Sequence, residues 1–328
     1  MQDILEYEQP TRYLVKSKKY NKDYKVPVLT AGKTFLLGYT NENTGIFPDT
    51  KLPVIIFDDF TTATKLVNFP FKVKSSAIKI LKAKSGEADI TFIFHMMQNI
   101  QFDASTHKRY WISQYSKLEI PLPPIEVQKK IIAEIESYQK IIDGAQQVVD
   151  NWKPVINIDP DWSLVELKSV ISINPKSSHN VKDAYDKGKY PFFTSGEKIK
   201  KLDTYLIDGQ NIIMADGGKA KFNFYNGKAS YSNHCYSFRS NNPRLQNRFL
   251  YYMLQNQEEY ITQNMFHGSG LKNLNRKNFL QLKISVPPIK IQEQIIGSIN
   301  QEQKIVDSCK SLIDIMKSKI QQTISKIY

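Results

Sequence analysis

The sequence contains few cysteines and no long hydrophobic run. Its two cysteines, Cys235 and Cys309, lie in segments of different character, which predicts free thiols in a reducing compartment rather than a disulfide framework. No apolar run approaches the roughly 18 residues that a membrane-spanning helix needs. The first residues, MQDILEYEQP, lack the basic and hydrophobic regions of a secretory signal. These absences predict a cytoplasmic protein that does not act at a membrane.

Motifs that would identify an enzyme are also scarce. The sequence FHGSG at residues 266–270 formally matches a glycine loop that holds S-adenosylmethionine, but asparagine-rich sequence follows it instead of the helix of a βαβ unit. Glu166 and Lys168 have the acidic-x-Lys spacing of a nuclease, yet only Asp161 lies nearby as a second carboxylate. The five histidines form no pair with metal-ligand spacing. The sequence therefore predicts a non-catalytic chain that itself binds no metal and no cofactor.

One long segment occurs twice. Residues 118–150 (LEIPLPPIEVQKKIIAEIESYQKIIDGAQQVVD) and 282–314 (LKISVPPIKIQEQIIGSINQEQKIVDSCKSLID) align without a gap at a shift of 164, with 14 of 33 positions identical. In each copy a strand-like run ends at two prolines. Because proline is tolerated at a helix start and holds the preceding residue extended, this pattern predicts helices that begin near Ile125 and Ile289.

Both predicted helices carry apolar or small residues at alternating steps of four and three, which is the heptad spacing of a coiled coil. The positions in the first helix are Ile131, Ile135, Tyr138, Ile142, Ala145, Val149 and Trp152. The positions in the second are Ile295, Ile299, Val306, Cys309, Ile313, Met316 and Ile320, with Glu302 and Thr323 as polar interruptions. Their matched length and register favour mutual packing over the alternative of two amphipathic helices on separate domains.

The duplication extends into the segments between the helices. PVLTAGK at 27–33 resembles PFFTSGE at 191–197, VIIFDD at 54–59 resembles NIIMAD at 211–216, and FHMMQN at 94–99 resembles YYMLQN at 251–256. Short β-type runs are predicted at 24–30, 35–40, 53–57 and 77–81, before a helical pattern at 90–99. The chain opens about ten residues late relative to DWSLVELKSV at 161–170, which predicts that the first unit lacks an edge element.

The predicted fold is therefore α+β, with two duplicated domains that alternate with two long helices. We expect the first domain at residues 1–117 and the second at 154–281. A strand and a helix would follow each domain, at 118–153 and at 282–328.

The chain is strongly basic. It has 45 lysines and arginines against 32 acidic residues, a net charge of +13 and a pI near 9.4, which favours a polyanionic partner such as nucleic acid. Only six of the basic residues are arginine, so a generally lysine-rich composition is the alternative explanation.

These features together resemble a known family. The sequence PLPPIEVQKKIIAEIE, the segment GSGLKNLNRKNFLQLKISVPPIKIQEQI, and the alternation of two variable units with two similar helices are similar to specificity (S) subunits of type I restriction–modification systems. The resemblance covers nearly the whole chain. It implies two target-recognition domains that each read one half of a split double-stranded DNA target, and helices that pair as an antiparallel coiled coil. It also implies docking of two methyltransferase (M) subunits and of restriction (R) subunits, on which S-adenosylmethionine, ATP and magnesium are expected.

The predicted helix length is consistent with this interpretation. A helix of about 28 residues is about 40 Å long, similar to the 34 to 36 Å or so between half-sites one turn of B-DNA apart. Because the loops of the two units differ, we expect different half-sites and an asymmetric target. The alternatives are a DNA-binding or protein-bridging adaptor without a role in modification, and a chain whose late start disables its first domain.

Three pairs of loops supply candidate DNA contacts, since glycine turns let the backbone approach phosphate and basic side chains bind it. The first pair comprises Thr30, Gly32, Lys33, Thr34 and Tyr39 against Thr194, Ser195, Gly196, Lys198, Lys200 and Lys201. The second comprises Asp59, Thr61 and Thr62 against Asp216, Lys219 and Lys221. The third comprises Lys108 and Arg109 against His267, Ser269, Lys272 and Arg276. Among these residue types, aspartate can accept a hydrogen bond from the N4 amino group of cytosine, and arginine can donate two hydrogen bonds to guanine.

Overall fold

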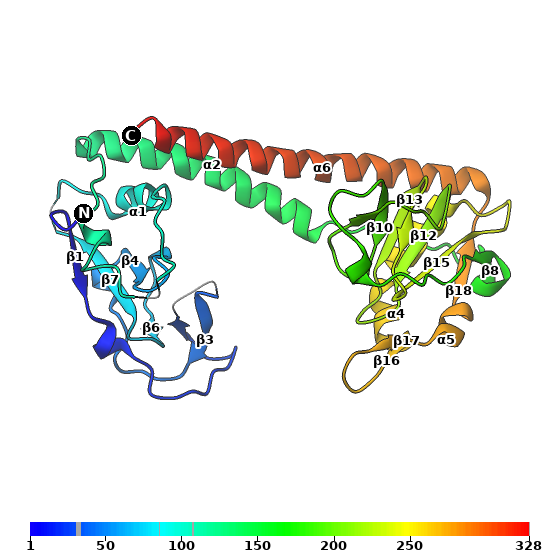
Figure 1. The fold of residues 1–328 in the computed structure, drawn as a ribbon, viewed down its shortest axis with the longest axis horizontal. Helices are drawn as coiled ribbons and strands as arrows, with labels where there is room; N and C mark the ends of the chain where they lie inside the picture. The colour runs from blue at the N-terminus through cyan, green and yellow to red at the C-terminus, as the bar shows by residue number, and fades with distance from the viewer. Residues whose placement is uncertain (31–33, 85, 107, 328) are drawn as a thin grey trace. The chain divides into compact units, whose positions relative to one another are not determined.

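The computed structural model describes residues 1–30, 34–84, 86–106 and 108–327, which divide into two compact units. Unit 1 comprises residues 1–147 and 309–328, and unit 2 comprises residues 148–308. Two long helices, α2 (Ile125–Asn151) and α6 (Ile289–Ser325), contribute residues to both units (Figure 1). Both helices begin at the predicted residue, directly after two prolines. None of the helices in the described part of the chain is long and apolar enough to cross a membrane.

Besides its parts of the long helices, the described residues of unit 1 form two small sheets and one short α-helix. Its elements are β1 (Leu5–Glu8), β2 (Val26–Leu29), β3 (Leu36–Thr40), β4 (Val54–Asp58), β5 (Thr64–Val67), β6 (Lys72–Val73), β7 (Ile78–Ala83) and α1 (Ile90–Gln98). One sheet is antiparallel, with the order β1-β7-β4-β5. The other has the order β3-β2-β6, in which β2 and β6 run parallel. The predicted runs correspond to β2, β3, β4, β7 and α1, whereas β1, β5 and β6 were not predicted.

Unit 2 repeats this arrangement. The equivalent elements are β9 (Ile171–Ile173), β10 (Tyr190–Phe193), β11 (Lys200–Leu202), β12 (Gln210–Ala215), β13 (Phe222–Asn226), β14 (Ser230–Tyr231), β15 (Cys235–Ser240) and α3 (Asn247–Asn256). The antiparallel sheet has the order β9-β15-β12-β13, and the second sheet has the order β11-β10-β14 with β10 and β14 parallel. The strand orders and directions match those of unit 1, so the structure confirms the predicted duplication.

Unit 2 also has elements that unit 1 lacks among its described residues. They are β8 (Ser163–Glu166), α4 (Glu258–Met265), β16 (Phe266–His267), β17 (Asn273–Leu274), α5 (Arg276–Leu280) and β18 (Lys283–Val286). Strands β16 and β17 form a hairpin, and β18 pairs with β8. The hairpin and α5 lie at the end of unit 2 away from α6 (Figure 1).

The strand predicted before α2 is not formed. In unit 2 the amide of Leu167 donates to the carbonyl of Leu282 (2.8 Å), and β8 directly precedes Leu167 and pairs with β18. In unit 1 the amino group of Met1 makes the equivalent bond to Leu118 (2.8 Å). Met1 thus takes the place of Leu167, and residues 119–122 have no paired strand among the described residues. The prediction of a strand there was wrong because a strand requires a partner.

One inner strand of each main sheet, β4 in unit 1 and β12 in unit 2, is buried on both faces. Along β4, Ile55 and Phe57 pack in one hydrophobic cluster of unit 1, while Val54 and Ile56 pack in a second. This division follows from the two-residue period of a strand, and it explains why VIIF reads as a continuous apolar run. In unit 2, β12 is divided between two clusters in the same way.

A fully buried glutamine near the start of each long helix joins that helix to its unit. Gln128 accepts a hydrogen bond from the amide of Asp89 (2.9 Å) and donates to the carbonyls of Glu87 (2.8 Å) and Pro123 (2.7 Å). Gln292 accepts from Gln246 (2.9 Å) and donates to the carbonyls of Arg244 (2.7 Å) and Pro287 (2.8 Å). The three partners are equivalent in the two units. The identical glutamines of the repeat are therefore structural.

Candidate nucleic-acid interface

In unit 2 the turn after β12 and the β16–β17 hairpin are joined through their backbones. The amide of Gly218 donates a hydrogen bond to the carbonyl of Lys272 (2.7 Å). The amide of Leu274 donates to the carbonyl of Asp216 (2.9 Å). Gly218 has φ +85° and Gly268 has φ +146°, conformations that favour glycine. A Cβ on Gly268 would lie 2.6 Å from the carbonyl oxygen of Leu271, so the hairpin depends on this glycine.

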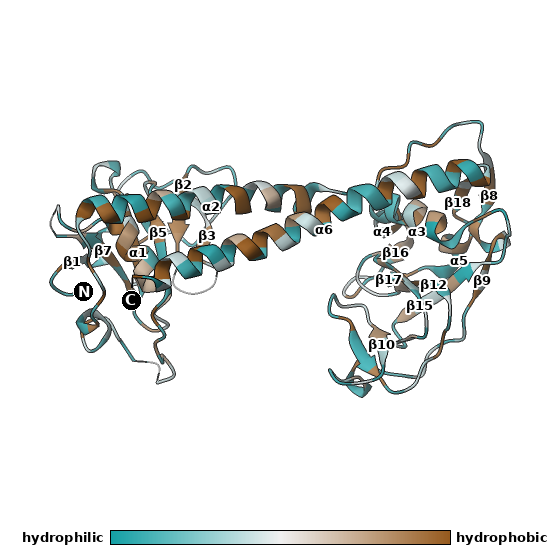
Figure 2. Cartoon of the chain, turned by 90° about the horizontal axis from the view of Figure 1, so that it is seen from above, coloured by the Kyte–Doolittle hydropathy of each residue, from teal (hydrophilic) through white to brown (hydrophobic). Residues whose placement is uncertain are grey.

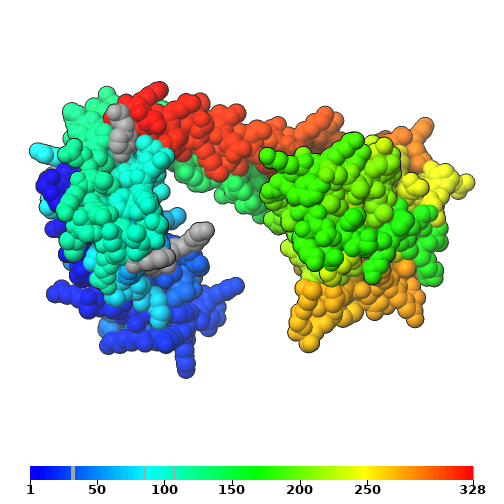
Figure 3. Space-filling model, in the orientation of Figure 1, coloured from blue at the N-terminus to red at the C-terminus, as the bar shows by residue number. Residues whose placement is uncertain are grey.

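The first predicted loop of unit 2, which follows β10, reaches the same place. The ammonium group of Lys221 donates to the carbonyl of Gly196 (3.3 Å), which joins the loop after β10 to the turn after β12. The structure therefore brings together the three loops that the sequence nominated in this unit. The segment around residues 260–275 projects from the surface of unit 2 in Figure 3.

The predicted residues on these loops differ in exposure. Those that are exposed are Ser195, Gly196, Lys198, Lys201, Lys219, His267, Ser269, Lys272 and Arg276. Lys200, Asp216 and Lys221 are half-buried. Thr194 is buried, and its hydroxyl oxygen accepts a hydrogen bond from the amide of Gly196 (3.1 Å), so it shapes the loop instead of offering a contact. Lys198 pairs with Asp186 (3.0 Å) at the surface.

Arg276 is held in a defined position at the start of α5. Its Nη2 lies 2.9 Å from a carboxylate oxygen of Asp216, and its guanidinium carbon lies 4.8 Å from the centre of the Tyr236 ring. Burial raises the pKa of the Tyr236 hydroxyl, and the nearby arginine partly opposes that rise. The Tyr236 hydroxyl therefore stays protonated, and its uncharged ring packs against the guanidinium of Arg276.

Unit 1 places its equivalent aspartate in the interior. Asp59 accepts from the amide of Trp111 (2.7 Å) and lies 3.6 Å from the ammonium group of Lys79, and both charged side chains are buried. The structure therefore argues against the predicted base contact at Asp59, because a buried, paired carboxylate cannot reach DNA without opening the fold. The residue closes a loop instead: its carbonyl accepts from the amide of Tyr110 (2.9 Å).

The turn after β4 in unit 1 remains accessible. Asp58 accepts from the amide of Phe60 (3.0 Å) and from the hydroxyl of Thr61 (2.6 Å), and Thr62 adopts φ +58°. The guanidinium of Arg109 lies 6.0 Å from the exposed Phe60 ring. Arg109 and Thr61 therefore lie on one local surface.

The remaining predicted residues of unit 1 are less concentrated. The exposed Lys108 lies over Tyr110, with 5.8 Å between its ammonium group and the ring centre. Thr30 closes a turn through its amide, which donates to the carbonyl of Phe35 (2.8 Å). Thr34 is exposed and Tyr39 is half-buried in β3. Gly32 and Lys33 lie outside the described residues.

Sequence reasoning missed two exposed apolar side chains on these loops. Leu271 is exposed at the tip of the β16–β17 hairpin, and Ile112 is exposed just after Arg109. No periodicity could have identified them, because both lie in irregular segments. Their neighbours in the sequence, a glycine-rich turn and a basic pair, were the only signal.

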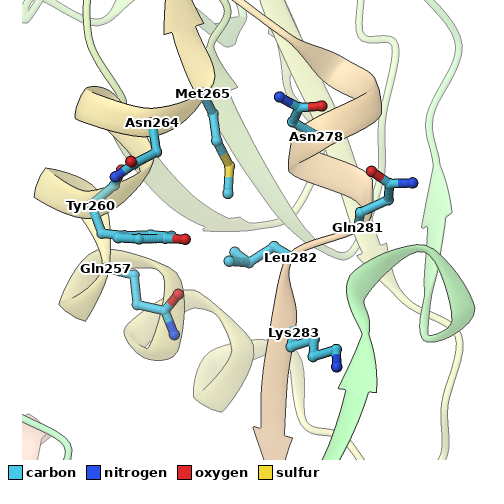
Figure 4. Close-up of a pocket in the computed structure, with 8 residues that line it drawn as sticks. All are labelled: Gln257, Tyr260, Asn264, Met265, Asn278, Gln281, Leu282 and Lys283. Atoms are coloured by element: carbon cyan, nitrogen blue, oxygen red, sulfur yellow. The ribbon is translucent and has the colours of Figure 1, made fainter.

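A separate cavity of about 650 Å³ lies between α4, α5 and β18. It is lined by Gln257, Tyr260, Asn264, Met265, Asn278, Gln281, Leu282 and Lys283. Met265 and Tyr260 point toward Leu282, with amide side chains around them (Figure 4). The cavity contains none of the residues predicted from the sequence and no arrangement of acid, base and nucleophile.

Burial affects two side chains of types that are used in catalysis or metal binding, Cys235 and His95. Burial raises the pKa of the Cys235 thiol to about 11, which keeps it protonated and unreactive. Burial lowers the pKa of His95, which is half-buried on α1. Within the described ranges, no three His, Cys, Asp or Glu side chains are grouped so as to hold a metal ion.

Most heptad positions of the long helices are buried or partly buried, whereas Glu302 is exposed. Buried members are Ile135, Ile142, Ala145, Ile299, Val306, Ile313 and Met316, and partly buried members are Ile131, Tyr138, Val149, Trp152, Ile295, Cys309 and Ile320. Hydrophobic and hydrophilic residues alternate along both helices in Figure 2. In unit 1, Ile135 and the C-terminal Ile324 share one hydrophobic cluster with Phe92 and Met96 of α1.

Polar contacts give the direction of pairing within unit 1. Thr323 donates to Glu134 (3.1 Å), and the ammonium group of Lys319 lies 5.5 Å from the centre of the Tyr138 ring. Since the residue number rises in one helix as it falls in the other, the helices pack antiparallel there. In unit 2 the indole of Trp152 donates to Glu302 (3.0 Å). Thus Glu302 and Thr323, which interrupt the apolar pattern, each make a hydrogen bond: Thr323 with Glu134 of α2, and Glu302 with Trp152 just after α2.

This architecture and sequence resemble those of known proteins. The model of the family "Type I restriction modification DNA specificity domain" matches residues 1–149 and 160–326. The chain is 47% identical over 144 residues to the type I restriction enzyme EcoR124I/EcoR124II specificity subunit of Escherichia coli, which covers 43% of this chain and 36% of that protein. It is 23% identical over 184 residues to the MjaVIII specificity subunit of Methanocaldococcus jannaschii, covering 49% and 43%. The matches thus span less than half the length of these relatives.

Two solved structures share the fold. The S subunit of a type I restriction–modification system from M. genitalium aligns with a TM-score of 0.56 and 13% identity over 100% of this chain and 94% of that chain. A chain from a structure that describes complex assembly and conformational transition of the type I R-M system aligns with a TM-score of 0.54 and 14% identity, covering 99% and 97%. At these identities the similarity concerns the fold alone.

Proposed function

The chain belongs to the family of type I restriction–modification DNA specificity domains, and from this premise we propose that it reads the DNA target of such a complex. Each unit would read one short half-site of double-stranded DNA. Because the loops of the two units carry different side chains, the target would be split and asymmetric. The observation that carries the proposal is one sheet arrangement present twice with two different sets of loops.

The loop chemistry of unit 2 supports this role. Three loops converge and present the exposed ammonium groups of Lys219 and Lys272 beside exposed glycine backbone. Lysine binds phosphate without reading sequence, and glycine allows close approach of the backbone, so the surface would position unit 2 on the duplex. In unit 1, Arg109, Lys108 and Thr61 would have the corresponding task. The net charge of +13 supports a polyanionic partner.

The chain would act by positioning its partners. We infer that it is non-catalytic and holds two adenine methyltransferase subunits, and with them restriction subunits, on the bound target. S-adenosylmethionine, ATP and magnesium would be bound by those partners. Removal of the target adenine from the base stack would be a step of the methyltransferase.

The long helices are the proposed docking site for the methyltransferase. Besides their buried faces they expose apolar side chains, among them Ile305 (61% exposed) and Ile315 (53% exposed) on α6. Replacing both by lysine should reduce co-purification of the methyltransferase while leaving the fold intact, because neither side chain is buried. Undiminished stoichiometric binding by this double variant would exclude these residues of α6 as the docking face.

The decisive test is a methylation map. The chain would be expressed with its cognate methyltransferase in a host that lacks adenine methylation, and modified adenines would be located across the host genome. A split, asymmetric motif with a fixed gap is the expected result. A stable complex that methylates nothing, with a methyltransferase shown to be active beside another specificity chain, would refute the proposal.

A further inference from the structure

We propose that Arg276 reads a guanine in the half-site bound by unit 2, and that Ile112, at the equivalent position of unit 1, does not make this contact. The inference rests on the proposed function and extends it to one specificity-determining residue. The side chain of Arg276 is 42% exposed, and Arg276 is the first residue of α5, directly after the β16–β17 hairpin and Asn275.

The guanidinium of Arg276 is prepared for a bidentate partner. Asp216 engages one terminal nitrogen at 2.9 Å, and the ring of Tyr236 supports the guanidinium at 4.8 Å. A guanidinium has five N–H donors, so one salt bridge leaves donors for a second planar acceptor. Asn275 caps the first turn of α5 by accepting from the amide of Asn278 (3.2 Å), which fixes the backbone that carries Arg276.

Guanine is the base that matches this group. Its O6 and N7 atoms form a pair of acceptors in the major groove, and arginine donates to both in one plane. Because Asp216 and Tyr236 already restrict the side chain, less conformational entropy is lost on binding. The exposed Lys219 and Lys272 lie on the two loops that meet beside Asp216, where they would bind the flanking phosphates.

Unit 1 has different chemistry at the equivalent place. The register of the main sheets pairs Phe57 with Lys79 in unit 1 and Met214 with Tyr236 in unit 2, so Lys79 takes the position of Tyr236. Lys79 is buried and pairs with Asp59, the counterpart of Asp216.

The repeat offset of 164 assigns Ile112 to the position of Arg276, and Ile112 is 60% exposed. The equivalent backbone bonds, Tyr110 to Asp59 and Leu274 to Asp216 (both 2.9 Å), support this correspondence. The cation that pairs with the equivalent aspartate is therefore buried in unit 1, as Lys79, but exposed in unit 2, as Arg276. An aliphatic side chain stands where unit 2 has its arginine, so the two half-sites should differ at this base pair.

The test uses the full chain in complex with its methyltransferase. Three variants would be mapped genome-wide beside the wild type: Arg276→Ala, Arg276→Lys and Lys272→Ala. Arg276→Lys retains the charge but not the planar fork, and Lys272→Ala removes a neighbouring charge as the matched control. Melting temperatures and co-purification of the methyltransferase would verify that each variant folds and assembles.

Arg276→Ala and Arg276→Lys should both relax one guanine position in one half-site, lowering its discrimination roughly 5- to 150-fold. Lys272→Ala should reduce modification at all sites without changing the motif. An unchanged motif in Arg276→Ala, or relaxation in both half-sites, would overturn the inference while leaving the proposed function intact. Absence of any split motif with the wild-type chain would refute the proposed function and this inference with it.

Discussion

Replacing Gln292 by methionine should destabilise unit 2 although the two side chains have similar volumes. The substitution removes one hydrogen bond accepted from Gln246 and two donated to the carbonyls of Arg244 and Pro287. At about 1 kcal/mol for each hydrogen bond, the expected loss in the free energy of unfolding is about 3 kcal/mol. The loss could exceed this value, because Gln292 is fully buried and methionine would leave the two carbonyls and the amide without these hydrogen bonds in the interior.

The assay should report on each unit separately, since a chain with two units need not unfold in one step. Native-state hydrogen exchange, followed by mass spectrometry, measures the opening free energy of peptides from unit 2 and uses unit 1 as an internal reference. A loss of 3 kcal/mol corresponds to roughly a 100-fold faster exchange for amides that open with unit 2.

Gln294→Met is the matched control, because Gln294 is exposed on the same helix two residues later. It should change the opening free energy by less than about 0.5 kcal/mol. If the amides of unit 2 exchange at the same rate in the Gln292→Met and Gln294→Met variants, the hydrogen bonds of Gln292 do not stabilise the attachment of α6 to unit 2. The equivalent substitution Gln128→Met should act on unit 1 instead.

Three further outcomes are expected. Burial acts to raise the pKa of Glu8, but hydrogen bonds from Lys82 and a tyrosine outweigh it and hold the pKa below its ordinary value. Glu8→Gln should therefore be less stable than the wild type above about pH 4.3, and urea unfolding should show this difference vanish as pH falls through the lowered folded pKa. Iodoacetamide at pH 8 should label the half-buried Cys309 and spare Cys235, whose pKa burial raises to about 11; equal labelling by mass spectrometry would contradict this. Lys219→Ala should lower the slope of log affinity against log salt by about 0.9 and leave the motif unchanged, and a changed motif would reveal a base contact.

Several features of the molecule could be predicted because they depend on local sequence. Both long helices begin at the predicted isoleucine, Ile125 and Ile289, since proline restricts its neighbour wherever the chain lies. The duplication was visible because equivalent strands keep the same apolar pattern. The three loops of unit 2 could be nominated because each carries a glycine beside lysines, although their convergence depends on tertiary contacts.

Other features depend on partners that are distant in the sequence. Asp59 and Asp216 are equivalent in sequence, yet Asp59 is buried against Lys79 while Asp216 binds Arg276 near the surface. Only the pairing of β4 with β7 brings Lys79 beside Asp59. Segment 119–122 has the sequence of a strand but no partner strand, so it does not become one.

The sequence by itself determined the two helices, the repeated unit and the basic character of the chain, because periodicity, proline geometry and net charge are properties of neighbouring residues or of composition. Tertiary structure decided which of the two equivalent aspartates lies near the surface, which predicted strand forms and which groups the buried glutamines bind. These features depend on burial and hydrogen bonding, and only the folded chain brings the atoms concerned together. The difference between Asp59 and Asp216 shows why residues at matching positions of a repeat can have different roles.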